Sequence, residues 1–508
     1  MRIFRWSVLL TAAVAWTVGF QRYAWSPAAV VGLLALLYWV RGAPSHWHAW
    51  LGVSGAYAIA ALIVVNNDYL QASTLLRLAL DLGGSLILAL PFVLHRAWSP
   101  RLSPLFRWIP FATAWVLLEW AQRSYGPYGS WGALAYSFTD VLPLMQWAAI
   151  GGVGAIALIV CIVAVWTEQM VVLRDKEAVS NGVALVVLLL VVFGYSWMRL
   201  PSKPSADLAR AAAVALDDAT YRSLAGRDMQ ALAQADASTR AQAAAAFAQA
   251  HERLLTHTRE ALAAGATLVV WPETVPTLEE QLPALIGAVQ QLAAEKNAEF
   301  LITPWLVLHA SEFPYGRNLA VAVDASGERL RFDKGHPVPG LETRIRSGGE
   351  VPALWAAQAG LATVAICMDY DFPSYIRAGA AAHPGLLLAP SDDWPAVRRV
   401  HLDMHRLRAI EMGSSMVRSA HNGRSALIDP YGRIIASADS DHDVMLLGDV
   451  PRHGVSTLYA AWGEWVEKAC AAIFILLLIW RLVKWRSFRP AQPPVEDAAR
   501  IDGTAATS

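Results

Sequence analysis

Apolar runs gather at both ends of this 508-residue chain and leave a long, more polar stretch between them. A helix needs about 20 residues to cross the hydrocarbon of a bilayer, so the shorter runs must include flanking residues. Since 56% of the residues are apolar and 16% are charged, the composition excludes a disordered chain and an ordinary soluble protein. We expect eight membrane spans, at residues 7–20, 27–40, 47–65, 83–94, 108–120, 144–166, 183–197 and 465–480.

The positive charges predict the orientation in the membrane. With eight spans, both termini share one side, and that side carries Arg2, Arg5, Arg41, Arg96, Arg101, Arg107, Arg174, Lys176, Arg481, Lys484, Arg486 and Arg489. The short loops of the other side carry only Arg22, Arg77 and Arg123. Because such an excess marks the cytoplasmic face, we expect cytoplasmic termini. The expected domains are a membrane domain with about seven helices at 1–200, an external domain at 201–463, a last membrane helix at 464–486 and a disordered cytoplasmic tail at 487–508.

Net charge and cysteine content narrow the classes of function. The 41 Lys and Arg residues balance 41 Asp and Glu residues, so bulk charge gives no support to a nucleic-acid partner. Three cysteines are too few for a disulfide framework, and two of them, Cys161 and Cys470, lie in or against apolar segments. Cys367 is therefore left without an obvious partner.

The external stretch has the pattern of a single α/β domain of about 260 residues. Candidate strands lie at 267–271, 300–303, 319–323, 363–367, 386–389, 415–419, 426–429 and 445–450. Helical patterns lie at 253–264, 277–296 and 401–412, and the Ala-rich stretch 228–265 is expected to be one amphipathic helix that ends at Gly265. Alternating strands and helices predict a layered α/β sandwich, with the strand order left open.

Three segments place a reactive side chain at or near the end of a candidate strand. Glu273 follows an apolar strand within Trp271-Pro272-Glu273-Thr274, Lys334 ends Phe332-Asp333-Lys334, and Cys367 ends the strand at 363–367. A thiol has a pKa of about 8.5, so attack on a carbonyl needs a nearby base, which Glu273 could supply. Lys334 and the Met368 backbone N–H could stabilise the resulting oxyanion. Taken singly, each residue also has a structural explanation as a packed thiol, a loop charge or a solvated lysine.

Together these segments resemble the nitrilase superfamily, and with membrane segments at both ends the chain resembles the apolipoprotein N-acyltransferase family. The resemblance covers nearly the whole chain. Its carriers are Trp271-Pro272-Glu273-Thr274 with Pro276, Lys334 to Glu342 with His336, Val338 and Pro339, Ile366-Cys367 with Asp369, Arg408 to Glu411, Arg418 to Gly423, Asp429 to Arg433, and, in the membrane part, Glu119-Trp120, Gly129-Ser130-Trp131 and Tyr136-Ser137.

The resemblance implies a multi-span α-helical membrane domain joined to an α-β-β-α nitrilase-like sandwich. It implies an N-acyltransferase in which Glu273 is the base, Lys334 the oxyanion stabiliser and Cys367 the nucleophile. Cys367 would take an acyl chain from a phospholipid as a thioester and pass it to the α-amine of a diacylglyceryl-cysteine lipoprotein. Glu342 would orient Lys334, and Asp369 would take the place of the family's acidic residue after the nucleophile. The implied location is the bacterial inner membrane with a periplasmic catalytic domain, and no metal or organic cofactor is required.

Several substrate-side positions depart from the family pattern and keep alternatives open. Met368-Asp369 stands where the family usually has Tyr-Glu, and the loop between Trp394 and His401 is about two residues short. We expect Trp394, His401 and Asn422 to contact substrate. The alternatives are a membrane-tethered amidase, or an acyltransferase acting on another amine, and a non-catalytic lipid-binding or scaffold protein. His401 and His405 have the spacing of a metal pair, but no third ligand is evident, so helix packing is the expected role.

Overall fold

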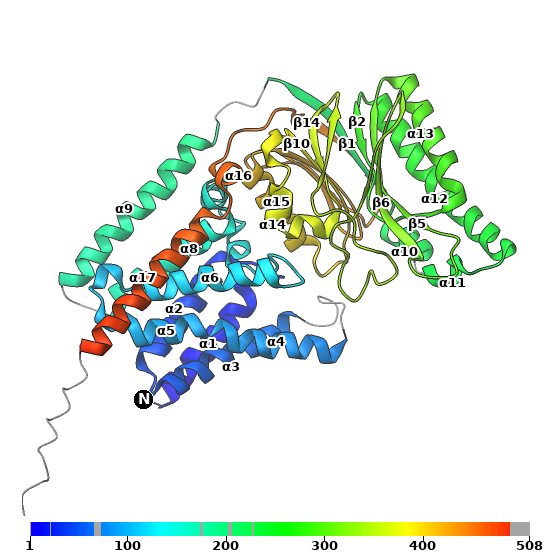
Figure 1. Ribbon diagram of the computed structural model, residues 1–508. Coiled ribbons are helices and arrows are strands. Elements are labelled where there is room, and N and C mark those ends of the chain that lie inside the picture. Colours follow the sequence, from blue (N-terminus) through cyan, green and yellow to red (C-terminus); the bar gives the residue numbers. More distant parts are fainter. Residues whose placement is uncertain are drawn as a thin grey trace, which may run out of the picture.

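The computed structural model describes residues 2–20, 22–65, 73–172, 176–201, 206–225 and 228–487. A helical part is built from both ends of the chain, and an α/β part is built from the middle (Figure 1). Apart from Ser487, the expected tail at 487–508 lies outside the described residues.

The apolar runs form the helices of the helical part. These are α1 (Arg2–Gly19), α2 (Ser26–Gly42), α3 (His46–Val64), α4 (Thr74–Leu88), α5 (Leu90–Trp98), α6 (Ile109–Tyr125), α7 (Leu142–Met145), α8 (Ala148–Val172), α9 (Lys176–Arg199) and α17 (Trp465–Ser487). Among the described residues, four stretches are long and apolar enough to cross a membrane: His46–Val64, Thr74–Arg101, Ala148–Val171 and Val179–Arg199. The apolar helices Trp6–Gly19 and Ser26–Gly42 are shorter.

Most of the expected spans have somewhat different bounds in the structure, and two of them are broken. The span at 83–94 crosses the junction between α4 and α5, and its helix already begins at Thr74. The charged residues Arg77 and Asp81 interrupt the apolar run, so the sequence did not indicate these first turns. In the structure the two residues form an ion pair four residues apart on one face of the helix. The span at 144–166 is interrupted because the backbone leaves the helical conformation at Gly151 and Gly152.

The kink at Gly152 lets α8 pack closely against the α/β part. Gly152 has a φ of +64°, and a Cβ atom there would lie 2.7 Å from the Tyr459 ring. After the kink the N–H of Val153 donates to Oε1 of Glu411 at 3.1 Å. The kink therefore places the start of the regular helix against a carboxylate of the other part.

The α/β part contains two sheets that pack face to face. The first has the order β14-β1-β2-β4-β6-β5-β3, with β7 paired to β6, and the second has the order β13-β12-β11-β10-β9-β8. The first comprises β1 (Leu208–Ala215), β2 (Leu268–Val270), β3 (Val275–Leu278), β4 (Glu299–Ile302), β5 (Pro304–Val307), β6 (Gly316–Asp324), β7 (Gly327–Asp333) and β14 (Val444–Pro451). The second comprises β8 (Ala353–Ala357), β9 (Gly360–Val364), β10 (Leu386–Asp392), β11 (Ser415–His421), β12 (Arg424–Ile428) and β13 (Ile434–Asp439).

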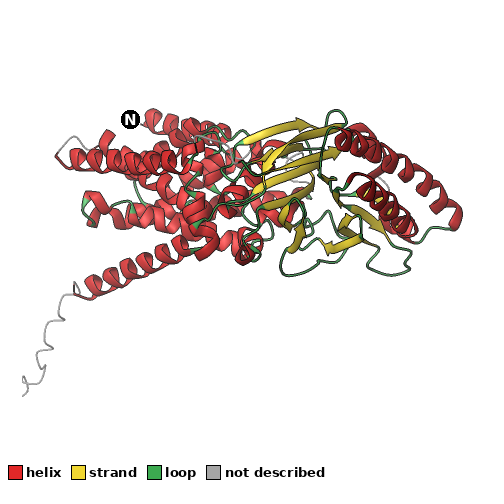
Figure 2. Cartoon of the chain, turned by 90° about the horizontal axis from the view of Figure 1, so that it is seen from above, coloured by secondary structure: helices red, strands yellow, loops and turns green. Residues whose placement is uncertain are grey.

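Helices cover the outer face of each sheet and complete the expected α-β-β-α sandwich. Helices α12 (Ala237–Ala263) and α13 (Leu282–Lys296) pack on the first sheet, and α15 (Arg398–Met412) packs on the second. Figure 2 shows the strands between the helical part and a helical layer at the far end. The shorter helices are α10 (Asp218–Ala225), α11 (Met229–Ala233), α14 (Pro373–Arg377) and α16 (Leu458–Trp462).

Helix α15 belongs to both parts of the protein. Leu402 and Ala409 pack into the core of the sandwich. Val400, Met404 and Leu407, from the opposite face of the same helix, join the core of the membrane helices. The outer layer of the second sheet is therefore also an inner layer of the helical part, and the two parts share packed side chains.

Some secondary structure differs from the sequence expectation. The predicted start of the helix at 277–296 was wrong. Val275–Leu278 forms strand β3, which pairs in parallel with β5, and the helix α13 begins only at Leu282, with Pro283 in its first turn. The single helix 228–265 is two helices, α11 and α12, although Gly265 does end it with a φ of +91°. The Ala-rich strand β1 was not predicted, since alanine favours helices and only its burial between layers selects a strand.

We predict that Gly152→Ala destabilises the protein by about 1–3 kcal/mol, because alanine must adopt a left-handed φ against the Tyr459 ring. Thermal unfolding in detergent measures this effect. Gly194→Ala in α9 is the control, since no neighbouring atom lies within 4 Å of a Cβ placed there. Equal melting temperatures for the two variants would contradict the close packing at the kink.

Candidate active site

The ends of parallel strands bring the predicted reactive side chains to one edge of the sandwich. Glu273 follows β2 and Lys334 follows β7, while Cys367 lies three residues after β9. Strands β9, β10 and β11 are parallel, as are β1, β2 and β4, so the carboxyl ends within each group share an edge. All three side chains are buried, with 1% of Glu273, 1% of Lys334 and 5% of Cys367 exposed.

Two carboxylates hold the Lys334 ammonium. Nζ lies 2.7 Å from Oε1 of Glu273 and 2.7 Å from Oε2 of Glu342. Nδ2 of Asn318 donates to both carboxylates, at 2.6 and 2.7 Å. Burial alone would lower the pKa of Lys334, but the two carboxylates raise it well above its ordinary value. Burial also raises the pKa of Glu273, although Lys334 opposes this shift. The site therefore holds a permanent cation beside a carboxylate with increased proton affinity.

Cys367 is not the last residue of a strand, which corrects the expected strand at 363–367. Strand β9 ends at Val364, and Cys367 opens a 3-10 turn, η5 (Cys367–Asp371), with a φ of +48°. This left-handed conformation turns the thiol out of the strand direction, and its Sγ lies 3.8 Å from the carbonyl oxygen of Asp392. Burial, followed by the charge of Glu273, raises the pKa of Cys367 well above its ordinary value. The resting thiol is therefore protonated, and attack requires a base.

Asp369 ties the turn of Cys367 to the loop of Lys334. Its carboxylate accepts hydrogen bonds from the backbone N–H groups of Ile366, Gly335 and His336, at 2.9, 3.3 and 2.7 Å. The side chain is fully buried. These hydrogen bonds of Asp369 thus position the backbone that carries Cys367 and Lys334. Met368 lies beside Cys367 and lines a cavity that is described below.

Asp392, at the end of β10, joins the two sheets at the site. Its N–H donates to Oε2 of Glu273 at 2.8 Å. Its carboxylate accepts from Thr274 at 2.8 Å, from Asn422 at 2.9 Å and from the Tyr221 hydroxyl. Burial and the nearby Glu273 raise the pKa of Asp392 to about 7. Asn422, an expected substrate contact, is therefore bonded to Asp392 in this structure.

His401 and His405 do not merely pack on a helix surface, which corrects that expectation. Nδ1 of His401 lies 2.5 Å from Asp393 and Nε2 lies 3.3 Å from Asp371. Arg418 pairs with Asp393 at 2.8 Å and donates to His405 at 2.9 Å. Although burial lowers it, these carboxylates raise the pKa of His401 to about 9, while Arg418 and His401 hold that of Asp393 at about 2. The buried cluster is thus a set of ion pairs.

The same residues also correct the expectation that no third metal ligand exists. Among the described residues, Cys367, Asp393 and His401 place potential ligand atoms within 4.8 Å of one another, as do Asp371, His401 and His405. A metal needs a neutral imidazole and a thiolate. In this structure the partners of His401 and Asp393 are Asp371, Arg418 and each other, so these ligand atoms are engaged in ion pairs.

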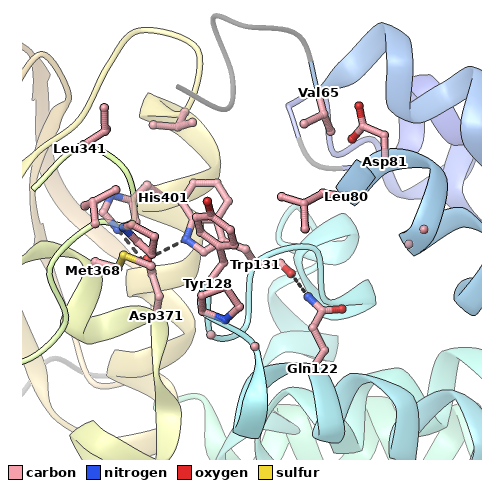
Figure 3. Close-up of a pocket in the computed structure, with 18 of the residues that line it drawn as sticks. Val65, Leu80, Asp81, Gln122, Tyr128, Trp131, Leu341, Met368, Asp371 and His401 are labelled. Atoms are coloured by element: carbon pink, nitrogen blue, oxygen red, sulfur yellow. Dashed lines mark hydrogen bonds and ion pairs between the residues drawn. The ribbon is translucent and has the colours of Figure 1, made fainter. Parts of the chain in front are cut away.

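An apolar cavity of about 650 Å³ separates this edge of the sandwich from helices α4 and α6. In Figure 3, Met368, Asp371 and His401 lie on one side of it and Val65, Leu80 and Asp81 on the other. Cys367 and Trp394 also line the cavity. The nucleophile candidate therefore faces a space whose far wall is formed by apolar helices.

A loop of the helical part docks on the turn of Cys367. The backbone N–H and hydroxyl of Ser130 both donate to the carbonyl oxygen of Asp371 at 2.8 Å. Trp131 donates to the Asp371 carboxylate at 2.7 Å (Figure 3). Gly129 has no room for a side chain, because a Cβ would lie 2.4 Å from that same carbonyl oxygen. The two parts thus meet directly at the site.

Sequence reasoning missed Asn318, Asp371, Asp392 and Asp393 as site residues. Asn318 immediately precedes the apolar run 319–323, and a polar amide at a buried strand was the available signal. The acidic pair Asp392-Asp393 follows a buried strand as Glu273 does, and the same strand-end argument could have found it. Only the fold reveals Asp371, since its partners come from the helical part and from α15.

Comparisons with known proteins cover both parts of the chain. The family profile of the apolipoprotein N-acyltransferase N-terminal domain matches residues 12–166, and that of carbon-nitrogen hydrolases matches residues 231–459. An apolipoprotein N-acyltransferase from Azotobacter vinelandii is 30% identical over 93% of this chain and 94% of its own. The chain belongs to the apolipoprotein N-acyltransferase family.

Other relatives extend over similar lengths. An apolipoprotein N-acyltransferase from Pseudomonas putida is 30% identical over 87% of this chain and 88% of its own. Among solved structures, an amidase from Nesterenkonia sp. is 18% identical, with a TM-score of 0.35 over 50% of this chain and 94% of that one. Membership of this acyltransferase family accounts for a nitrilase-type sandwich joined to apolar helices.

We predict that the stability difference between the natural protein and His401→Gln decreases as pH rises from 6.5 to 9. A raised pKa stabilises the folded state fully below the unfolded value of 6.5, and this contribution, about 3 kcal/mol, is lost through pH 9. Melting temperatures across this range measure the loss. The exposed His309→Gln is the control variant, measured over the same pH range. A His401→Gln difference that stays constant or grows toward alkaline pH would contradict the ion pairs.

Proposed function

We propose that this protein transfers a fatty acyl chain from a phospholipid, through a thioester on Cys367, to the N-terminal amine of a diacylglyceryl-cysteine lipoprotein. The observation that carries the proposal is the position of Cys367, which lines an apolar cavity shared with α4 and α6. A cavity between membrane helices and a nucleophile suits an acyl donor drawn from the bilayer. The family's name and the match over both parts favour acyl transfer over the amidase alternative.

In the first half-reaction, Glu273 takes the thiol proton as the Cys367 sulfur attacks the ester carbonyl. The negative charge that develops on the carbonyl oxygen is stabilised by the Lys334 ammonium and by the Met368 backbone N–H. When the carbon–oxygen bond breaks, the lysophospholipid alkoxide takes the proton back from Glu273 and leaves as an alcohol. The acyl chain remains on sulfur as a thioester.

In the second half-reaction, the acceptor amine attacks the thioester carbonyl and loses a proton to Glu273. Collapse of the intermediate breaks the carbon–sulfur bond, and the sulfur takes this proton to restore the thiol. Glu342 and Asn318 keep Lys334 in place in both steps, as their hydrogen bonds and ion pair support. The proposed location of this chemistry is the periplasmic side of the inner membrane, with residues 201–463 as the catalytic domain and both termini in the cytoplasm.

We predict that phospholipid alone adds one fatty acyl group to the purified protein, which intact-mass spectrometry detects and hydroxylamine removes. Cys367→Ala keeps Cys161 and Cys470 and is expected to gain no acyl group, because those two thiols are buried among apolar helices. An acyl group on the Cys367→Ala protein would refute Cys367 as the nucleophile. Equal complementation by this variant, in a strain lacking its own acyltransferase, would instead favour a non-catalytic role.

We predict that Glu273→Gln slows formation of the thioester by about 10²- to 10⁴-fold, because the amide cannot accept the thiol proton. The rate of acyl-enzyme formation measures the effect. Glu295→Gln, on the exposed face of α13, is the control and is expected to react at the natural rate. A Glu273→Gln protein with the natural rate would exclude Glu273 as the base.

A further inference from the structure

A second cavity opens on the other side of the catalytic residues. It has a volume of about 730 Å³ and is bounded by α10, α11, β5 and the loop that follows Lys334. Its walls therefore come from the α/β part alone, whereas α4 and α6 help to form the first cavity.

The two cavities divide the proposed catalytic residues between them. Cys367 lines the apolar cavity, and Glu273 and Lys334 line the second one. Val338, Leu341, Asp392, Asp393 and Trp394 line both, so the loop after Lys334 and the end of β10 form the partition at which the two cavities adjoin. The nucleophile thus opens toward the membrane helices, and the base beside it opens toward the adjoining second cavity.

The walls of the second cavity are more polar than those of the apolar cavity, although Met229, Phe247 and Trp305 also line it. Arg222 on α10 and Arg344 in the loop after Lys334 line it and are exposed. Asn422, Thr274 and Tyr221 also line it, with their hydrogen bonds directed to the Asp392 carboxylate. Guanidinium groups donate to peptide carbonyls and carboxylates. A polypeptide backbone can therefore be bonded here, whereas it would leave unpaired polar groups in the apolar cavity.

We propose that this second cavity binds the peptide portion of the acceptor, with its amine at the partition and its lipid chains in the apolar cavity. This assignment rests on the proposed function. The chemistry of the second half-reaction supports it, since the attacking amine must pass a proton to Glu273, which lines this cavity. An amine that arrives from this side meets the base and the thioester together.

The experiment separates the two half-reactions in the full-length protein. Two variants alter the cavity wall at exposed positions. One carries both Arg222→Ala and Arg344→Ala, and the other carries Thr343→Trp, which narrows the cavity. The controls, Arg259→Ala and Thr256→Trp, make the same changes at exposed positions of α12 outside the cavity. Each protein is first acylated with phospholipid, and the acyl-enzyme is then discharged with a diacylated lipopeptide or with hydroxylamine.

We expect both wall variants to form the acyl-enzyme and to react with hydroxylamine within about twofold of the natural rates. Discharge by lipopeptide is expected to be slower by about tenfold at limiting lipopeptide, which corresponds to a loss of roughly 1.4 kcal/mol of binding. Rapid-quench measurements of the remaining thioester give each rate. The control variants are expected to match the natural protein in all three reactions.

Other outcomes overturn the assignment in distinguishable ways. Normal acylation with unchanged lipopeptide discharge in both wall variants would show that the peptide binds elsewhere. Slower acylation by phospholipid would show that the second cavity receives the donor headgroup instead. A natural protein that never forms a thioester would refute the proposed function itself, and this assignment with it.

Discussion

The buried ammonium of Lys334 is the constraint on which the site depends. Removing a charge from water costs several kcal/mol unless opposite charges and hydrogen bonds compensate it. Glu273 and Glu342 supply the charge, and Asn318 holds both carboxylates in place. Since Glu273 also accepts the N–H of Asp392, this cluster binds the first sheet to the second at their shared edge. Removal of either carboxylate would leave an uncompensated charge and loosen that edge.

The same edge is fixed to the helical part by contacts at the turn of Cys367. Ser130 and Trp131 bond to Asp371, and α15 contributes side chains to both hydrophobic cores. A nucleophile on a loop of an isolated sandwich would face water. Here the turn is bonded directly to the loop after α6, so the thiol is held against a cavity whose other wall is made by apolar helices.

The sequence predicted the parts of the fold that local pattern determines. The apolar strand β10, which begins with three leucines, was found because its burial on both faces produces a continuous apolar run. Strand β1 was missed because alanine has no strand preference of its own and only tertiary packing selects it. The short strand β3, which contains Pro276 between Val275 and Thr277, was missed because residues 277–296 were predicted to be helical.

The site was predictable where a strand end carries a reactive group, as at Glu273 and Lys334. The conformation of Cys367 was not, since a positive φ on a non-glycine residue reflects what surrounds the turn rather than its own preference. The ion pairs of His401 were equally hidden, because Asp371, Asp393 and Arg418 come from three separate segments. Spacing reveals residues on one element, and only the fold reveals partners from several.

A thioester in such a site must react with an amine and not with water. The acyl chain on Cys367 would extend into the apolar cavity and exclude water from that side. Water in the second cavity would lie beside Glu273, which could activate it as it would activate an amine. A peptide that occupies the second cavity displaces this water and places its amine beside the base. Under the proposed arrangement, the donor acyl chain and the acceptor peptide approach Cys367 from two adjoining cavities, and a peptide in the second one favours the amine over water.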